Sequence, residues 1–375
     1  MQGSDPGRSR ARDIVTIGAS AGGIEALTTL VCNLPPDVPA AFFVVVHIPA
    51  EAPSALPEIL SRAGPLPASS ARDGAPIEHG HIYVAPPDRH LLLTPAGMRV
   101  VSGPRENRHR PAIDPLFRSA ALHFGRRVVG VVLSGALDDG TAGLLAIKRA
   151  GGIALVQDPA TAAFSSMPES ALAYVAVDWC LPVPKLAKKI VALASGTMVE
   201  EVERKGAVQV VDETDEMDEE QRTELQVETE IAGLNPASIG RVPPNGQLSA
   251  FSCPACHGPL WEIQDGSLLR FRCRVGHAFT AESVVEGLDD NVEEALWMAV
   301  NTLDESEQLN LRLAEQARER KHTRMAEIFT RKARTMSERA TVLRRLLTNE
   351  SQGQKQRNNG GDGSEADVDA MEAGG

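Results

Sequence analysis

Three short apolar runs in the chain each end in a turn that contains glycine or proline. They occupy residues 13–23 (DIVTIGASAGG), 41–49 (AFFVVVHIP) and 127–140 (RVVGVVLSGALDDG). β-Branched residues are frequent in each run, which is typical of strands buried on both faces of a parallel sheet. A polar residue closes each run: Ser20, His47 and Asp139. Because ligands bind at the carboxyl edge of an open parallel sheet, these side chains are predicted to share that edge.

Helical patterns alternate with the apolar runs between residues 13 and 195. Helices are predicted over Ile24–Asn33, Asp114–His123, Thr141–Ala150 and Leu186–Ala194, and a further strand over Gly152–Val156. Residues 82–85 are predicted to form a strand, and the following PPDRHLLLT segment has the character of a hairpin. The alternation predicts an α/β fold: a doubly wound, mostly parallel sheet with helices on both faces.

The remaining sequence divides by composition into further segments. The predicted boundaries are a disordered leader at 1–12, the α/β domain at 13–198, an acidic, solvated linker at 199–248, a cysteine-rich zinc-ribbon unit at 249–289, a helical hairpin at 290–348 and a disordered tail at 349–375. The hairpin turn is expected near residues 318–323. Apolar stripes mark the two helices: Val292, Leu296, Ala299 and Leu303, then Phe329, Ala333, Met336, Ala340, Leu343 and Leu347.

Charge and length limit the classes of function. The net charge of −12 over 375 residues argues against nucleic acid as the main partner, because phosphate binding needs a positive surface. The longest apolar runs are too short to cross a bilayer, and no apolar segment typical of a secretory signal follows the first residues. Five unevenly spaced cysteines do not indicate a disulfide framework, so a reducing cytoplasm is expected.

Four residues in the cysteine-rich unit have the spacing of zinc ligands. Cys253 and Cys256 form one pair, and after sixteen intervening residues Cys273 and His277 form a second. Asp265-Gly266 between the pairs is typical of a two-residue hairpin turn, which would bring the pairs together. Four protein ligands predict a structural zinc rather than a catalytic one. The alternative is a set of reduced, buried thiols, and His257 is a weaker ligand candidate than His277.

Each of the three sheet-edge residues also has a simpler explanation. Ser20 and Asp139 both precede predicted helices and are preferred helix N-cap types, and a lone histidine at a strand end is usually structural. Asp138 has the same position as Asp139 and is an equal candidate by position alone. The glycine spacing around Ser20 is not that of a dinucleotide-binding loop. A hydroxyl nucleophile needs a base oriented by a carboxylate, and the coincidence of all three types favours hydrolytic chemistry.

Several collinear segments resemble one family. They are IGASAGGIEAL, VVVHIP, HIYVAPPDRHL, RPAIDPLFRSAA, VVLSGALDDGTAGL and QDPATAAFSSMPESAL. Residues 13–195, about half the chain, resemble the catalytic domain of the CheB-type chemotaxis receptor protein-glutamate methylesterases. The resemblance implies Ser20 as nucleophile, His47 as general base and acid, and Asp139 as its orienting residue. It also implies an oxyanion hole from the backbone N–H groups near Ala21 and Ala136.

The resemblance implies hydrolysis of a γ-glutamyl methyl ester on a chemoreceptor helix, with release of methanol and no catalytic cofactor. Some members of the family also deamidate glutamine. The family commonly has threonine at the position of Ala21 and Met-Gly at the positions of Ala136 and Leu137. Leu137 thus replaces a glycine, and a positive φ at this position would be strained for leucine. The family's phospho-acceptor receiver domain is not expected before residue 13. Activation by phosphorylation of such a domain within the same chain is therefore not expected either.

Three functions compete at this point. The first is a receptor methylesterase with a zinc and helical extension that docks a signalling partner. The second is a non-catalytic signalling scaffold with the same fold. The third, nucleic-acid binding through Arg270, Arg272 and Arg274, is the least favoured. Arg110 either guides an acidic receptor segment or is an ordinary loop arginine, and Asp88 and His90 are given no chemistry.

Overall fold

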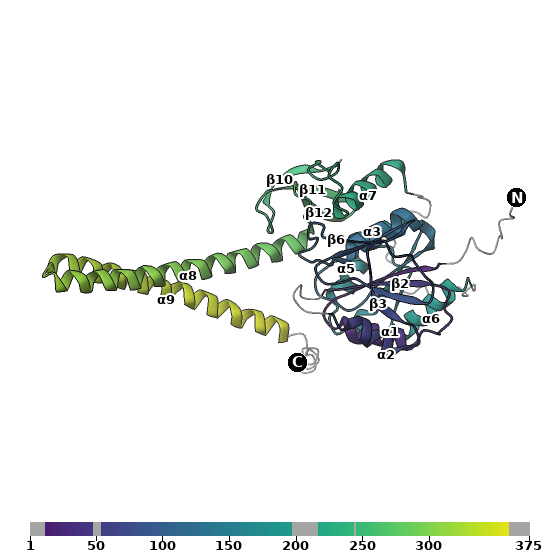
Figure 1. Ribbon diagram of the computed structural model, residues 1–375, viewed down its shortest axis with the longest axis horizontal. Helices are drawn as coiled ribbons and strands as arrows, with labels where there is room; N and C mark the ends of the chain where they lie inside the picture. Colours follow the sequence, from purple (N-terminus) through teal and green to yellow (C-terminus); the bar gives the residue numbers. More distant parts are fainter. Residues whose placement is uncertain (1–11, 48–53, 197–216, 244, 360–375) are drawn as a thin grey trace, which may run out of the picture. The chain divides into compact units, whose positions relative to one another are not determined.

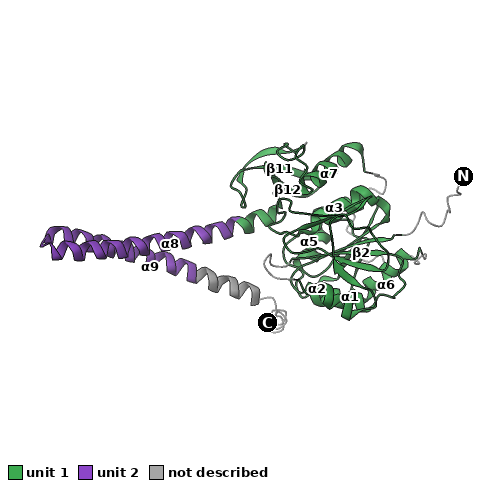
Figure 2. Ribbon diagram, viewed as in Figure 1, with its two compact units in different colours: residues 1–287 green, residues 288–375 purple. Residues whose placement is uncertain are grey.

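The computed structural model describes residues 12–47, 54–196, 217–243 and 245–359 (Figure 1). The chain divides into two compact units, residues 1–287 and residues 288–375 (Figure 2). None of the described helices is both long enough and apolar enough to cross a membrane. The predicted leader at 1–12 lies outside the described residues except for its last residue.

A seven-stranded parallel sheet forms the centre of the first unit. Its strands are β1 (Ile14–Ala19), β2 (Ala41–Val46), β3 (Ala68–Ser70), β4 (His81–Val84), β7 (Val128–Val132), β8 (Ile153–Gln157) and β9 (Trp179–Leu181). The order β3-β4-β2-β1-β7-β8-β9 places β1 between β2 and β7, with all pairs parallel. The chain therefore builds outward from β1 in both directions, and the predicted parallel α/β fold is confirmed.

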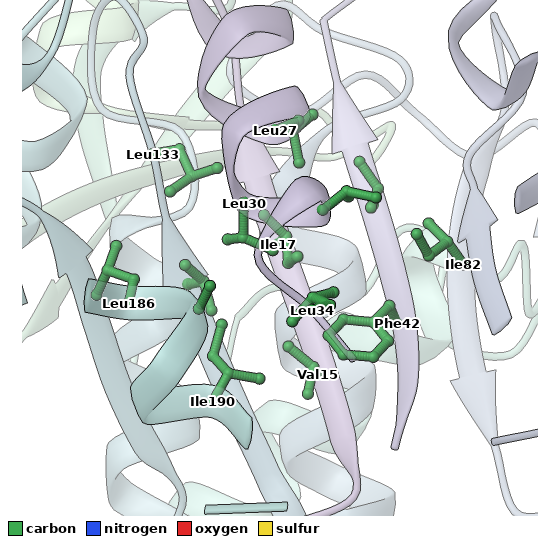
Figure 3. Close-up of a cluster of buried hydrophobic side chains, with 14 of the residues drawn as sticks. Val15, Ile17, Leu27, Leu30, Leu34, Phe42, Ile82, Leu133, Leu186 and Ile190 are labelled. Atoms are coloured by element: carbon green, nitrogen blue, oxygen red, sulfur yellow. The ribbon is translucent and has the colours of Figure 1, made fainter. Parts of the chain in front are cut away.

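Helices cover both faces of this sheet. One face packs against α1 (Gly23–Cys32), α2 (Leu56–Ala63) and α6 (Val183–Ala194), and the other against α3 (Ile113–Phe124), α4 (Thr141–Arg149) and α5 (Ser166–Tyr174). Figure 3 shows the first core, in which Val15 and Ile17 of β1 meet leucines and isoleucines of α1 and α6. β1 is buried at every position because both of its faces are covered.

Shorter elements connect these layers. The single-turn helices η2 (Gly125–Arg127) and η3 (Pro159–Thr161) precede β7 and follow β8. The hairpin predicted near residues 82–94 begins later, as β5 (His90–Thr94) and β6 (Gly97–Val101), because β4 joins the parallel sheet instead.

The interpretation of the whole acidic segment as a solvated linker is wrong for its described part. Residues 219–232 form α7 (Glu219–Ala232), capped by the Asp218 carboxylate, which accepts a hydrogen bond from the Gln221 N–H at 2.8 Å. Its Glu228 is buried beside Arg118, Arg270 and Arg272. Burial alone would raise the pKa of Glu228, but these arginines hold it well below its usual range.

The cysteine-rich segment forms a second, antiparallel sheet. Its strands are β10 (Gln247–Ser252), β11 (Pro259–Asp265), β12 (Leu268–Cys273) and β13 (Ala278–Thr280), paired in that order. The predicted hairpin is confirmed, but its two-residue turn is Gly266-Ser267 rather than Asp265-Gly266, because β11 and β12 pair in register from Leu260↔Cys273 to Asp265↔Leu268. We call residues 247–280 the Cys/His unit. It belongs to the same compact unit as the parallel sheet.

Two long helices, α8 (Ala281–Glu319) and α9 (Thr323–Asn359), make the predicted helical pair and its turn. Along α9 the buried positions recur every seven residues at Ala326, Ala333, Ala340 and Leu347. The apolar stripe predicted for the first helix, α8, is wrong at Val292, because this residue is 56% exposed. The tail prediction is wrong for residues 349–359, which continue α9, and residues 360–375 lie outside the described residues.

Candidate active site

Ser20, His47 and Asp139 form a hydrogen-bonded line at the carboxyl edge of the parallel sheet. Ser20 and His47 directly follow β1 and β2, and Asp139 lies in the loop between β7 and α4. The Ser20 Oγ lies 3.0 Å from His47 Nδ1, and His47 Nε2 lies 2.7 Å from Asp139 Oδ2. The side chains of His47 and Asp139 are 7% and 2% exposed. The three strands are adjacent, which explains why residues distant in sequence meet here.

The N-cap interpretation of Ser20 is wrong. Helix α1 begins at Gly23, and its N-cap is Gly22, which makes no side-chain capping bond. Gly22 has a φ of 69°, and a Cβ there would lie 2.6 Å from the Ala163 Cβ. Only glycine fits this position of the turn. Because Gly22 rather than Ser20 is the N-cap, the Ser20 hydroxyl is free to face His47.

Asp139 is held by several donors in addition to His47. Its Oδ2 accepts from the Ile113 N–H at 2.7 Å, and its Oδ1 accepts from the Asp114 N–H at 3.3 Å. Both N–H groups belong to the first turn of α3, where free amides favour a negative charge. Burial alone would raise the pKa of Asp139, but hydrogen bonds from His47, Ile113 and the side chain of Asn107 lower it below its usual range.

The structure separates the two neighbouring aspartates. Asp138 Oδ1 accepts a hydrogen bond from the Ser283 Oγ at 3.0 Å, whereas Asp139 faces His47. The N-cap of α4 is Gly140, so the N-cap interpretation of Asp139 is wrong as well.

Asn107 and Asp114 extend the polar network, and the motif reasoning missed both roles. The Asn107 Nδ2 donates to Asp139 Oδ1 and to Asp114 Oδ2, each at 2.9 Å. The Asp114 Oδ1 accepts from the Gly143 N–H at 2.6 Å. Burial and the nearby Asp139 charge raise the pKa of Asp114. The asparagine amide therefore bridges two buried carboxyl groups whose pKa values move in opposite directions.

His109 lies against His47. Its ring stacks on His47 with centroids 3.6 Å apart and planes inclined by 10°. Burial, and then the charge of His47, lower the pKa of His109 from 6.5 to about 4. His109 is therefore neutral near pH 7 and covers one face of His47. A histidine inside a loop carries no periodic signal, so the sequence did not single it out.

His109 is expected to make folding stability fall in acid. Its folded-state pKa of about 4 lies below the unfolded value of 6.5, so the unfolded chain takes up the proton first. Stability is unaffected above pH 6.5 and declines by about 3 kcal/mol as the pH falls to 4. Urea unfolding at several pH values should give a shallower decline for His109→Gln. An unchanged decline would contradict this assignment, and the remaining slope is expected to include the buried His90.

The loop after β7 closes over Ser20. A Cβ at Gly135 would lie 2.9 Å from the Ser20 Cβ, so this loop approaches the serine closely. The Ser134 Oγ donates to the Ala21 carbonyl at 2.8 Å and ties the two loops together. Within the described parts of the chain, no acceptor engages the Ala21 or Ala136 N–H. The oxyanion-hole role of these two amides stays a prediction.

Leu137 stores strain in the same loop. Its φ of 61° lies in the left-handed region, which disfavours side chains with a Cβ. Leu137→Gly is expected to be more stable than Leu137→Ala by about 0.5–1 kcal/mol in the free energy of unfolding, because only glycine relieves the strain. It should therefore unfold at a higher temperature. The alanine variant controls for loss of the leucine side chain. Equal stability of the two variants in thermal unfolding would show that the loop is not strained.

The four predicted metal ligands come together in the Cys/His unit. Cys256 Sγ and Cys273 Sγ are 3.7 Å apart, and His277 Nδ1 lies 3.5 Å from Cys273 Sγ and 3.7 Å from Cys253 Sγ. All four candidate ligand atoms lie within 4.8 Å of one another. His257, with a φ of 58°, is not part of this group.

Other candidate residues have structural partners. The Arg110 Nε donates to Asp88 Oδ1 at 2.9 Å, and its Nη1 donates to the Gly103 carbonyl at 2.9 Å, so it is a partly buried arginine with structural partners. The buried His90 accepts from the Ala112 N–H through Nδ1 and donates to the Pro104 carbonyl through Nε2. Arg270 and Arg272 form ion pairs with Glu228, which removes them from a nucleic-acid surface.

The sequence of the α/β segment is similar to that of known proteins. Residues 15–190 match the sequence model of the CheB methylesterase family. This segment is a CheB methylesterase domain. The domain is 40% identical over 185 residues to protein-glutamate methylesterase/protein-glutamine glutaminase 2 of Anaeromyxobacter dehalogenans (strain 2CP-C), which covers 49% of this chain and 54% of that protein.

Two further comparisons define the extent of the similarity. The identity to the protein-glutamate methylesterase/protein-glutamine glutaminase of Yersinia pestis bv. Antiqua (strain Antiqua) is 38% over 186 residues, 48% of this chain and 53% of that protein. The crystal structure of the Thermotoga maritima CheB methylesterase catalytic domain is 32% identical, with a TM-score of 0.48, and covers 49% of this chain and 99% of that chain. The chain spans about half the length of the curated relatives it matches.

Proposed function

We propose that this protein is a serine hydrolase that removes methyl esters from glutamyl side chains of a chemoreceptor. The observation that carries the proposal is the line Ser20–His47–Asp139, which lies within the CheB methylesterase domain. A scaffold without catalysis has no need of a buried base joined to both a hydroxyl and a carboxylate, so the enzyme is favoured over that alternative.

The first step is attack of Ser20 Oγ on the ester carbonyl. The Asp139 carboxylate accepts a hydrogen bond from His47 Nε2–H, which leaves Nδ1 unprotonated toward Ser20. His47 Nδ1 takes the serine proton as the Oγ–carbon bond forms. The buried Asp139 carboxylate then stabilises the imidazolium. The carbonyl oxygen gains negative charge, and the Ala21 and Ala136 N–H groups would stabilise it.

Collapse of the tetrahedral intermediate completes the reaction in two stages. His47 returns the proton to the leaving methoxide, so that methanol departs and a glutamyl ester of Ser20 remains. Water then gives a proton to His47 and attacks the ester carbonyl. As the bond between Ser20 Oγ and the acyl carbon breaks, His47 returns this proton to Oγ, which releases glutamate and recovers the serine hydroxyl. A glutamine side chain would follow the same course with ammonia as the leaving group. The names of the relatives, which pair methylesterase with glutaminase, support this second reaction.

We also propose that Cys253, Cys256, Cys273 and His277 hold a structural zinc ion. Ligands about 2.3 Å from a tetrahedral ion lie about 3.8 Å from one another. Three pairs of these ligand atoms are 3.5–3.7 Å apart, and all four atoms lie within 4.8 Å of one another. Three thiolates and one imidazole are a donor set that zinc prefers, and four protein ligands leave no position for a substrate. Metal analysis of the purified protein should find one zinc per chain, which Cys273→Ser reduces.

Methanol release from methylated receptor cytoplasmic fragments tests the proposed function. The full-length protein is expected to release methanol in proportion to the methyl groups present, and none from unmethylated fragments. Absence of release by the folded, zinc-loaded protein would overturn the receptor methylesterase assignment. A cytoplasmic location and a signalling partner for the α8–α9 hairpin stay predictions.

A further inference from the structure

The segment that follows β6 contacts the triad at two points and the Cys/His unit at a third. Asn107 contacts Asp139, and His109 stacks on His47. The same segment pairs with the Cys/His unit, since the Asn107 N–H donates to the Ala278 carbonyl at 2.8 Å. One short stretch of chain therefore lies between the proposed zinc site and two members of the triad.

The Asn107 side chain connects the two sites directly. Its Oδ1 accepts from the Thr280 N–H of the Cys/His unit at 3.0 Å, and its Nδ2 donates to Asp139 and Asp114. Asn107 is 3% exposed, and both hydrogens of its amide point to carboxylates. An amide suits this position because it donates at one end and accepts at the other, which neither a carboxylate nor an ammonium group does.

A second contact joins the residues that directly follow the Cys/His unit to the loop between β7 and α4. The Ser283 Oγ, in the first turn of α8, donates to Asp138, the residue before Asp139. Ser283 is fully buried, and Asp138 is 3% exposed. The segment from Ala278 to Ser283 thus contacts the loop that carries the triad aspartate, once through Asn107 and once directly.

The position of this segment depends on the proposed zinc ligands. Cys273 is the last residue of β12, and His277 immediately precedes β13. The Cys273 N–H donates to the His277 carbonyl at 2.9 Å, which closes the turn between these strands. A metal bound by both side chains would hold this turn, and with it Ala278 and Thr280, in place.

We propose that Asn107 is a positioning residue that aligns Asp139 with His47, and that the metal-loaded Cys/His unit holds Asn107 in that position. The proposal rests on the proposed function of the triad. Loss of the Asn107 amide leaves Asp139 Oδ1 with only the longer hydrogen bond from the Asp114 N–H at 3.3 Å, so that the carboxylate is aligned less firmly with His47 Nε2. Loss of the metal has the same consequence, because β13 no longer fixes the Asn107 amide.

The test measures the reactivity of Ser20 without a receptor. Full-length protein is treated with a fluorophosphonate, and mass spectrometry gives the rate at which the Ser20 peptide is modified. Asn107→Ala is expected to slow modification by about 10- to 100-fold, because a small misalignment of a catalytic group has effects of this size. Ser283→Ala removes a contact at the same interface without touching Asn107 and is expected to slow it much less. Equal rates for Asn107→Ala and wild type would overturn the proposal.

A double-mutant cycle separates positioning from general destabilisation. Because Asn107 acts through Asp139, the double variant Asn107→Ala/Asp139→Ala should react no more slowly than Asp139→Ala. A merely structural role would slow the double variant by the product of the two factors, and that result would overturn the proposal.

Metal removal supplies the second cycle. Stripping zinc with a chelator should slow Ser20 modification in wild type but leave Asn107→Ala unchanged, with circular dichroism used to verify that the protein stays folded. A wild type that remains folded and equally reactive without metal would overturn the link. Failure of the receptor assay with normal Ser20 modification would count against the proposed substrate alone. Absence of Ser20 modification in wild type would overturn the catalytic triad and this inference together.

Discussion

Replacing Ser20 with alanine is expected to reduce methanol release by about 10⁶-fold. The variant keeps the backbone turn, because Gly22 and Gly23 still provide it, but no other group takes the place of the Oγ that lies 3.0 Å from His47. His47 then has no hydroxyl to deprotonate, and no acyl-enzyme forms. Steady-state methanol release from methylated receptor fragments measures the effect.

A matched serine provides the control for this variant. Ser61 lies in α2, and its Oγ donates to the Ala68 carbonyl at 3.1 Å, so Ser61→Ala removes a hydroxyl without touching the triad. Ser61→Ala should keep the wild-type rate. If Ser20→Ala also keeps it, Ser20 is not the nucleophile.

Asp139→Asn is expected to reduce turnover by about 10⁴-fold while the fold is retained. Asparagine has the shape of aspartate, but it has only one acceptor oxygen, so an amide nitrogen at the Oδ2 position cannot accept the hydrogen bonds from His47 and Ile113. The amide also favours the tautomer of His47 whose Nδ1 carries a proton, and this tautomer cannot act as the base toward Ser20. The effect should appear in kcat, with KM little changed.

Asp138→Asn is the control that separates the two adjacent carboxyl groups. Asp138 contacts Ser283 and not His47, and an asparagine Oδ1 can still accept from the Ser283 hydroxyl. Its rate should therefore stay near that of wild type. A larger loss for Asp138→Asn than for Asp139→Asn would show that Asp138, and not Asp139, has the orienting role.

The sheet and the meeting of Ser20, His47 and Asp139 at its edge could be predicted because their signals are local. A strand buried on both faces is β-branched along its length, as in β1, β2 and β7, and the polar residue after each strand then falls at the same edge. Asp138 and Asp139 could not be separated in this way. Their roles depend on which carboxylate the first turn of α3 faces, and this is a tertiary contact.

The roles of Asn107, His109 and Glu228 could not be predicted for the same reason. Asn107 and His109 lie in an irregular segment, and their partners are far away in sequence. Glu228 is one of many acidic residues between positions 199 and 248, and only the arginines of α3 and β12 make it a buried residue. An acidic composition by itself indicates a solvated segment, so α7 was missed.

Detection of a glutamyl ester on Ser20 tests the central claim most directly. Full-length protein and methylated receptor fragment are mixed, quenched in acid during turnover, and digested for mass spectrometry. The triad mechanism predicts a receptor peptide joined to the Ser20 peptide with the loss of one methanol, and no such product for Ser20→Ala. Methanol release at the wild-type rate by Ser20→Ala, with no adduct on either protein, would contradict it.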